Sequence, residues 1–261
     1  MRSQVADLNT FEKHIQILIS KIPRDGSTFD LQKVFFQLTL DSATEFLFGE
    51  SVHSLSSKEG SEEQRFGIAF DSAQREITSR SRSGKLGSIF RALMFRSDNE
   101  FVESCKIVHS FVDRFVHSAL EKVQPTDAEK VIDGDGSPER YIFLNEMAKG
   151  TRDPIRLRAE LLNILLAGRD TTASLLSHTF FVLARRPDIW KNLTAEVDEL
   201  HGERPSYETL KDMKYLKNLL SECKFPSAAL HSAPTNHPKH FAFTLLSPST
   251  PAWPGNQSLF L

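Results

Sequence analysis

Cysteine is scarce in this chain, and so are the other compositional features that would assign a function directly. Two cysteines, Cys105 and Cys223, stand among 261 residues, too few for a disulfide scaffold or a thiolate metal cluster. The net charge of -2 gives no overall positive field, so nucleic acid is not an expected partner. Three tyrosines accompany twenty phenylalanines. We therefore expect most aromatic side chains to serve apolar packing.

Long uncharged apolar runs are absent as well. The N-terminal stretch MRSQVADLNTFEKH has no apolar signal core, so no anchor is expected there. The best candidate span, 161–184, carries Arg169 and Asp170 near its middle. Each of these charges would cost about 2.5–3.5 kcal/mol at a bilayer centre. We expect this segment to be a helix buried in a protein core.

Helical periodicity dominates residues 1–224, and the predicted fold class is mainly α. Apolar residues recur at three- and four-residue steps over 31–48, 62–78 and 100–122, which is the pattern of helices with one buried face. Cys105 falls on the apolar side of the third segment. This position predicts a buried, inert thiol rather than a reactive one.

A longer helix is predicted in the second half of the chain. Asp153 is a good capping residue and Pro154 suits a first helical turn, and no breaker occurs before about Arg185. At about 1.5 Å per residue, some thirty residues span about 45 Å, enough to cross a whole domain. Shorter helices are predicted to follow, starting near Pro187, Ser206 and Met213.

The segment 79–96, SRSRSGKLGSIFRALMFR, carries five basic residues and no acid, interleaved with bulky apolar residues. One interpretation is a solvated loop whose apolar residues pack onto the body of the protein. The other is a patch that rests on an anionic membrane surface, because basic and bulky apolar side chains together favour that interface. The sequence leaves both open.

Two segments have the composition of irregular structure. Residues 125–140 form a polar linker with glycine and proline. Residues 225–261 hold six of the twelve prolines and no acidic residue, which predicts an irregular tail. We therefore expect one helical domain over 1–224, followed by this tail.

The run AGRDTT at 167–172 is unusual inside an apolar helix, because glycine, aspartate and threonine each cost a few tenths to about 1 kcal/mol there. Thr171 can donate to the carbonyl four residues earlier and loosen the helix, Gly168 lets a flat ligand approach the backbone, and Asp170 can supply a proton. These features predict a small groove facing a planar group. The alternative is a local ion pair of Arg169 and Asp170 on a solvent-facing strip.

The same six residues match the motif A/G-G-x-D/E-T-T/S, and the chain resembles the cytochrome P450 monooxygenases. LARRPDIWKNLTAEV resembles the next helix of that family, and LKDMKYLKNLLSE resembles the approach to its Glu-x-x-Arg helix. IPRDGSTFDLQKVFFQLTLDSATEFLFGESVHSL is similar to the fungal branch that hydroxylates alkanes and fatty acids. The resemblance covers about residues 8–222 and implies a partial P450 helical fold around the long central helix.

The resemblance also implies a cofactor and a reaction. Haem b would carry an axial cysteine thiolate on its iron, which favours O–O cleavage. Asp170 and Thr171 would be the catalytic acid–alcohol pair that helps to deliver protons, and Ala167, Gly168 and Thr172 would lie at the haem. An NADPH-linked cytochrome reductase would supply electrons, and one oxygen atom of O2 would enter an apolar, long aliphatic substrate. Relatives of this kind would be expected at the endoplasmic reticulum membrane.

Three features depart from the family pattern. Glu222 stands where the Glu of Glu-x-x-Arg belongs, but Phe225 replaces the arginine. Neither Cys105 nor Cys223 lies in a Phe-x-x-Gly-x-Arg-x-Cys loop, so the axial ligand is expected to be absent. No counterpart of the family's membrane anchor precedes Met1, which makes the cytoplasm the alternative location. Two hypotheses therefore stand: a monooxygenase fragment, or a catalytically inactive, truncated helical remnant.

Overall fold

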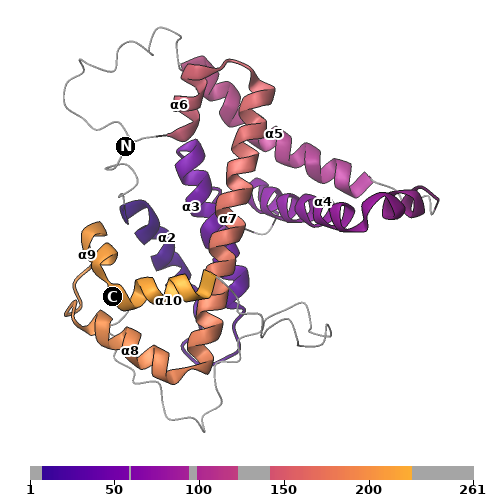
Figure 1. Ribbon diagram of the computed structural model, residues 1–261. Helices are drawn as coiled ribbons and strands as arrows, with labels where there is room; N and C mark the ends of the chain where they lie inside the picture. The colour runs from indigo at the N-terminus through magenta and orange to yellow at the C-terminus, as the bar shows by residue number, and fades with distance from the viewer. Residues whose placement is uncertain (1–7, 59, 94–98, 123–141, 225–261) are drawn as a thin grey trace. The chain divides into compact units, whose positions relative to one another are not determined.

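The computed structural model describes residues 8–58, 60–93, 99–122 and 142–224, and within these ranges the regular elements are helices (Figure 1). This confirms the mainly α fold class. The predicted linker at 125–140 and the tail at 225–261 lie outside the described residues. The helices are α2 (Leu8–Lys21), α3 (Leu31–Phe48), α4 (Glu62–Leu93), α5 (Asn99–Lys122), α6 (Phe143–Gly150), α7 (Pro154–Arg185), α8 (Pro187–Asp198), α9 (Tyr207–Asp212) and α10 (Lys214–Lys224).

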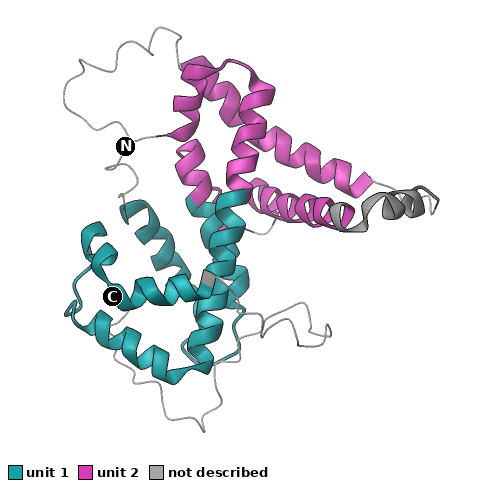
Figure 2. Cartoon of the chain, in the orientation of Figure 1, with its two compact units in different colours: residues 1–42, 167–261 teal, residues 43–166 magenta. Residues whose placement is uncertain are grey.

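The chain divides into two compact units (Figure 2). Unit 1 comprises residues 1–42 and 167–261, and unit 2 comprises residues 43–166. The division falls inside α3 and inside α7, and it separates the AGRDTT run from the first part of its own helix. The candidate site residues therefore all belong to unit 1.

Phenylalanine rings form much of the core of unit 2. Phe66 on α4 stacks on Phe111 of α5 with ring centroids 4.2 Å apart, and Phe115 of α5 stacks on Phe48 at the end of α3 at 4.8 Å. Stacked and tilted ring pairs contribute beyond their buried area. The Phe66–Phe111 pair helps to hold α4 and α5 side by side as a hairpin (Figure 1), which agrees with the packing role expected for the phenylalanines.

The basic segment lies largely within α4. The backbone is helical as far as Leu93, so the loop interpretation of 79–96 is wrong over that length, and the helix predicted over 62–78 is twice as long as expected. Among the basic side chains, Arg80 is described: its guanidinium pairs with Glu76 at 3.1 Å and lies 4.2 Å from the Phe101 ring centroid. A basic run without acids is compatible with a helix when its neighbours supply such partners.

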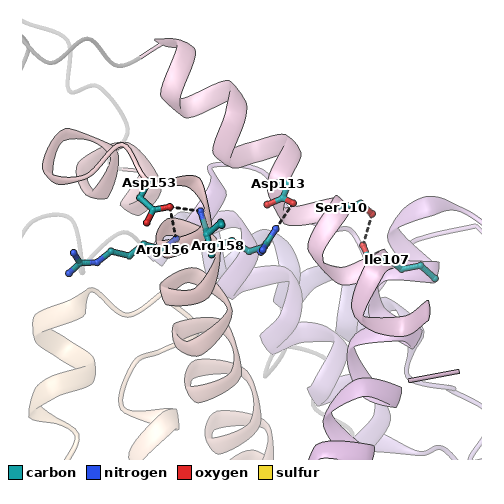
Figure 3. Close-up of polar contacts among 7 residues, drawn as sticks. Ile107, Ser110, Asp113, Asp153, Arg156 and Arg158 are labelled. Atoms are coloured by element: carbon teal, nitrogen blue, oxygen red, sulfur yellow. Dashed lines mark hydrogen bonds and ion pairs between the residues drawn. The ribbon is translucent and has the colours of Figure 1, made fainter. Parts of the chain in front are cut away.

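Helix α7 begins where the sequence predicts. The Asp153 carboxylate accepts hydrogen bonds from the backbone N–H groups of Ile155 at 2.9 Å and Arg156 at 3.3 Å (Figure 3). These groups are among the N–H donors that lack a partner in the first helical turn. On the same turn, Arg158 pairs with Asp113 of α5 at 2.6 Å. The cap fixes the start of α7, and the ion pair ties that start to α5.

In unit 1, α8 and α10 pack around one apolar cluster. Leu183, Leu219 and Cys223 form its buried centre. The Glu196 carboxylate of α8 accepts from the backbone N–H groups of Tyr215 at 2.7 Å and Leu216 at 2.8 Å. A carboxylate at this place satisfies two of the first N–H groups of α10 and complements the helix dipole.

The two cysteines differ in burial. Cys223 is buried in the apolar cluster of unit 1, whereas Cys105 is half-buried on α5. The neighbouring Ser104 is the buried residue at that turn, so the apolar stripe predicted through Cys105 is rotated by one position there. Partial burial nevertheless raises the pKa of the Cys105 thiol, because it disfavours the charged thiolate.

Candidate functional site

Along one side of α7, every fourth residue from 161 to 173 is buried, and these residues form a row. Leu161, Leu165, Arg169 and Ala173 are each 3% exposed or less. Residues four apart lie on the same side of a helix, so the arginine occupies a place in a row of apolar residues. The apolar spacing in the sequence indicates a buried stripe here, but it does not predict that Arg169 is buried within that stripe.

Arg169 and Asp170 do form an ion pair, but not on a solvent-facing strip. The Arg169 Nη1 atom lies 3.6 Å from Asp170 Oδ1, and the arginine side chain is 4% exposed against 26% for the aspartate. The guanidinium carbon is also 5.1 Å from the centroid of the Phe36 ring on α3. The alternative that placed both charges toward water is therefore wrong for Arg169.

Thr171 makes the hydrogen bond that its position predicts. Its Oγ1 donates to the carbonyl oxygen of Ala167 at 2.7 Å. Such a bond to the carbonyl four residues earlier is typical of threonine in helices. The helix continues unbroken through 167–172, so the expected loosening leaves the helical assignment intact. The hydroxyl oxygen keeps its acceptor capacity for another donor.

Ala167, Gly168, Thr171 and Thr172 lie exposed on α7, away from its buried row. A Cβ atom built on Gly168 meets no other heavy atom within 4 Å. Among the described residues, nothing therefore blocks another group from approaching the backbone at this glycine. The arrangement combines small side chains, a fixed hydroxyl and a half-buried carboxylate on one stretch of helix.

Sequence reasoning did not single out two acids of α3. Asp41 and Glu45 are 1% and 2% exposed, four residues apart on one side of the helix, and both interact with other groups. Buried carboxylates are rare unless they are paired. The available signal is their four-residue spacing on α3, which places both on one side of the helix.

The comparison with known families decides the classification. The model for cytochrome P450 matches residues 6–223. The chain belongs to the cytochrome P450 family. The resemblance drawn from AGRDTT and its neighbouring segments is thereby confirmed, and the match runs from before α2 into the last turn of α10.

Individual P450 relatives are similar over most of this chain. Cytochrome P450 52A12 of Debaryomyces hansenii is 44% identical over 238 residues, which cover 85% of this chain and 44% of that protein. Cytochrome P450 monooxygenase g430 of Fusarium sp is 46% identical over 241 residues, 85% of this chain and 41% of that protein. This P450 chain thus spans less than half the length of the curated relatives that it matches.

A solved structure supports the fold. The heme domain of cytochrome P450DA matches with a TM-score of 0.62 at 20% sequence identity, over 82% of this chain and 44% of that domain. At this identity the match shows the fold alone. Within the described part of the P450 chain, no helix combines the length and apolar character needed to cross a bilayer.

Proposed function

We propose that the chain carries the oxygen-activating wall of a haem-thiolate monooxygenase, whose reaction inserts one oxygen atom of O2 into a long aliphatic substrate. Asp170 and Thr171 are the catalytic pair of this proposal, and Ala167, Gly168 and Thr172 contact the cofactor. The observation that carries it is the 2.7 Å bond from Thr171 Oγ1 to the Ala167 carbonyl oxygen, made beside an open Gly168.

The residues at 167–172 fit a haem on one of its faces. Alanine and glycine leave space for a flat group against the helix, since nothing lies within 4 Å of a Cβ at Gly168. When bound, haem would supply the redox chemistry that activates O2. The protein's own contribution would be to hold the Thr171 hydroxyl at a fixed place and to exchange protons with water through the half-buried Asp170 carboxylate.

Neither cysteine suits the axial position of such a haem. Cys223 lies in the apolar cluster with Leu183, and Leu183 is twelve residues beyond Thr171, about 18 Å along the helix axis. Cys105 has a raised thiol pKa, which opposes the thiolate form that binds iron. We therefore propose that the axial cysteine is absent from this chain, which favours a catalytically inactive helical remnant as the second candidate function.

The remaining parts of the proposal follow the family. We propose that the helical domain ends at residue 224, supported by the family match that ends at 223, with 225–261 as a separate tail. An NADPH-linked reductase is the proposed electron donor. The endoplasmic reticulum membrane is the proposed location, and the basic segment 79–96 is proposed to rest on its surface; the cytoplasm is the alternative.

Haemin titration of the complete chain tests the proposal. Saturable binding that gives a Soret band is expected if the wall at 167–172 accepts the cofactor, and a linear response without saturation would contradict it. Reduction under carbon monoxide then tests the cysteine argument. A spectrum without a thiolate-type Soret band is expected, whereas a thiolate-type band would show that Cys105 or Cys223 binds iron and would overturn the inactive alternative.

A further inference from the structure

The structure leaves one charged residue of the motif without a role in the proposal above, and it is the buried one. Arg169 occupies the four-residue row between Leu165 and Ala173, where all three residues are 3% exposed or less. Burying a guanidinium costs free energy that an apolar residue at this place would not incur. A structural requirement alone would be met by leucine, which already fills the two preceding places in the row.

The guanidinium contacts a carboxylate and an aromatic ring. Its Nη1 atom is 3.6 Å from Asp170 Oδ1, and its carbon atom is 5.1 Å from the Phe36 ring centroid. The adjacent Phe35 packs on Phe180 of α7 at 5.2 Å, so the stretch of α3 that carries Phe36 is fixed against α7. The planar guanidinium is therefore anchored by α3 on one side and offered to a carboxylate on the other.

The consequence concerns the carboxylate. Consecutive residues project about 100° apart around a helix, and the side chain of an aspartate has several staggered rotamers to choose from. A fixed cation within 4 Å favours the rotamer that turns the carboxylate toward it.

We propose that Arg169 is a positioning residue that holds the Asp170 carboxylate in a single orientation beside Thr171. The proposal deepens the function proposed above and rests on it for its catalytic meaning. Arg169 touches neither substrate nor cofactor in this account; it acts through Asp170. The hydroxyl of Thr171 is held by the Ala167 carbonyl and the carboxylate of Asp170 by Arg169, so each member of the pair has its own support.

The test measures the orientation of Asp170 directly. In the complete chain labelled with carbon-13 at aspartate, three-bond couplings about the Cα–Cβ bond report the rotamer population, and Asp170→Asn assigns the signal. One dominant rotamer is expected in the unmodified protein. In Arg169→Met the couplings should move toward rotationally averaged values, and Arg169→Lys should restore at least half of the difference. A role in stability alone would leave the couplings unchanged.

Controls keep the outcome decisive. Arg186→Met removes the same charge from an exposed arginine that precedes α8 and pairs with Asp188 at 2.7 Å, and it should leave the Asp170 couplings unchanged. If Arg169→Met does not fold, Phe36→Leu loosens the same guanidinium while keeping its charge, and partial averaging is expected. Averaged couplings in the unmodified protein would overturn the proposal. Because these measurements need no haem, their failure is separate from a failure of haemin binding.

Discussion

The two sides of α7 at the AGRDTT run differ in burial and in residue type. The inward side repeats a buried residue every fourth position, with Leu161 and Leu165 fully buried, and the outward side exposes Ala167, Gly168 and Thr171. The leucines and the alanine of the inward side are good choices for stability, whereas glycine and threonine are poor choices for a solvent-exposed helix. The difference agrees with the function proposed above, in which the outward side serves binding and the inward side serves folding.

The largest change in stability is expected when a buried side chain on the inward side is shortened. Leu161→Ala should lower the free energy of unfolding by about 2–5 kcal/mol, because a fully buried leucine leaves a cavity that the surroundings fill only in part. Denaturant unfolding followed by circular dichroism gives the value. The control is Ile164→Ala, at a residue that is 36% exposed, where a clearly smaller loss is expected. Equal losses would remove the contrast between the two sides.

A smaller loss is expected at the helix start, which belongs to neither side. Asp153→Ala should cost about 1 kcal/mol, since it removes the acceptor for the N–H groups of Ile155 and Arg156. Hydrogen exchange at these two amides should quicken, while exchange near Ala173 should respond only to the global change. Unaltered protection at Ile155 would mean that water caps the helix equally well.

A gain in stability is expected on the outward side. Gly168→Ala should raise the free energy of unfolding by about 0.5–1 kcal/mol, because alanine is the better helix former and its Cβ would enter open space. Thermal and denaturant unfolding measure the gain. Destabilisation would show that the glycine serves the fold, contrary to the comparison.

The smallest effect is expected at the hydroxyl. Thr171→Ala should change the free energy of unfolding by less than about 0.5 kcal/mol, since the loss of the bond to the Ala167 carbonyl is offset by the higher helix propensity of alanine. Thr172→Ala, at the exposed neighbour, provides the matched control. A loss of more than about 1 kcal/mol in the free energy of unfolding, seen in Thr171→Ala but not in Thr172→Ala, would show that the hydrogen bond of Thr171 mainly stabilises the fold.

The sequence predicts the fold well where local chemistry decides it. Asp153 and Ser206 each cap a helix at the place where the sequence predicts a helix start. The helix that begins at Leu31 ends before Gly49, whose φ of +81° favours glycine. The bond from Thr171 to Ala167 follows from spacing alone. Contacts made in the folded chain account for what the sequence misses. The buried Arg169 lies against Phe36 of α3, and Arg80, in the basic segment of α4, pairs with Glu76 and lies over the Phe101 ring.

The most direct test of the outward side compares haemin binding in two glycine variants. Gly168→Leu places a large side chain over the open backbone, and Gly150→Leu makes the same change at another glycine whose Cβ would meet nothing within 4 Å. Haemin affinity should fall at least tenfold in the first variant and remain unchanged in the second, with both proteins folded. Equal affinities for haemin in the two variants would contradict the claim that this side of α7 is kept for binding.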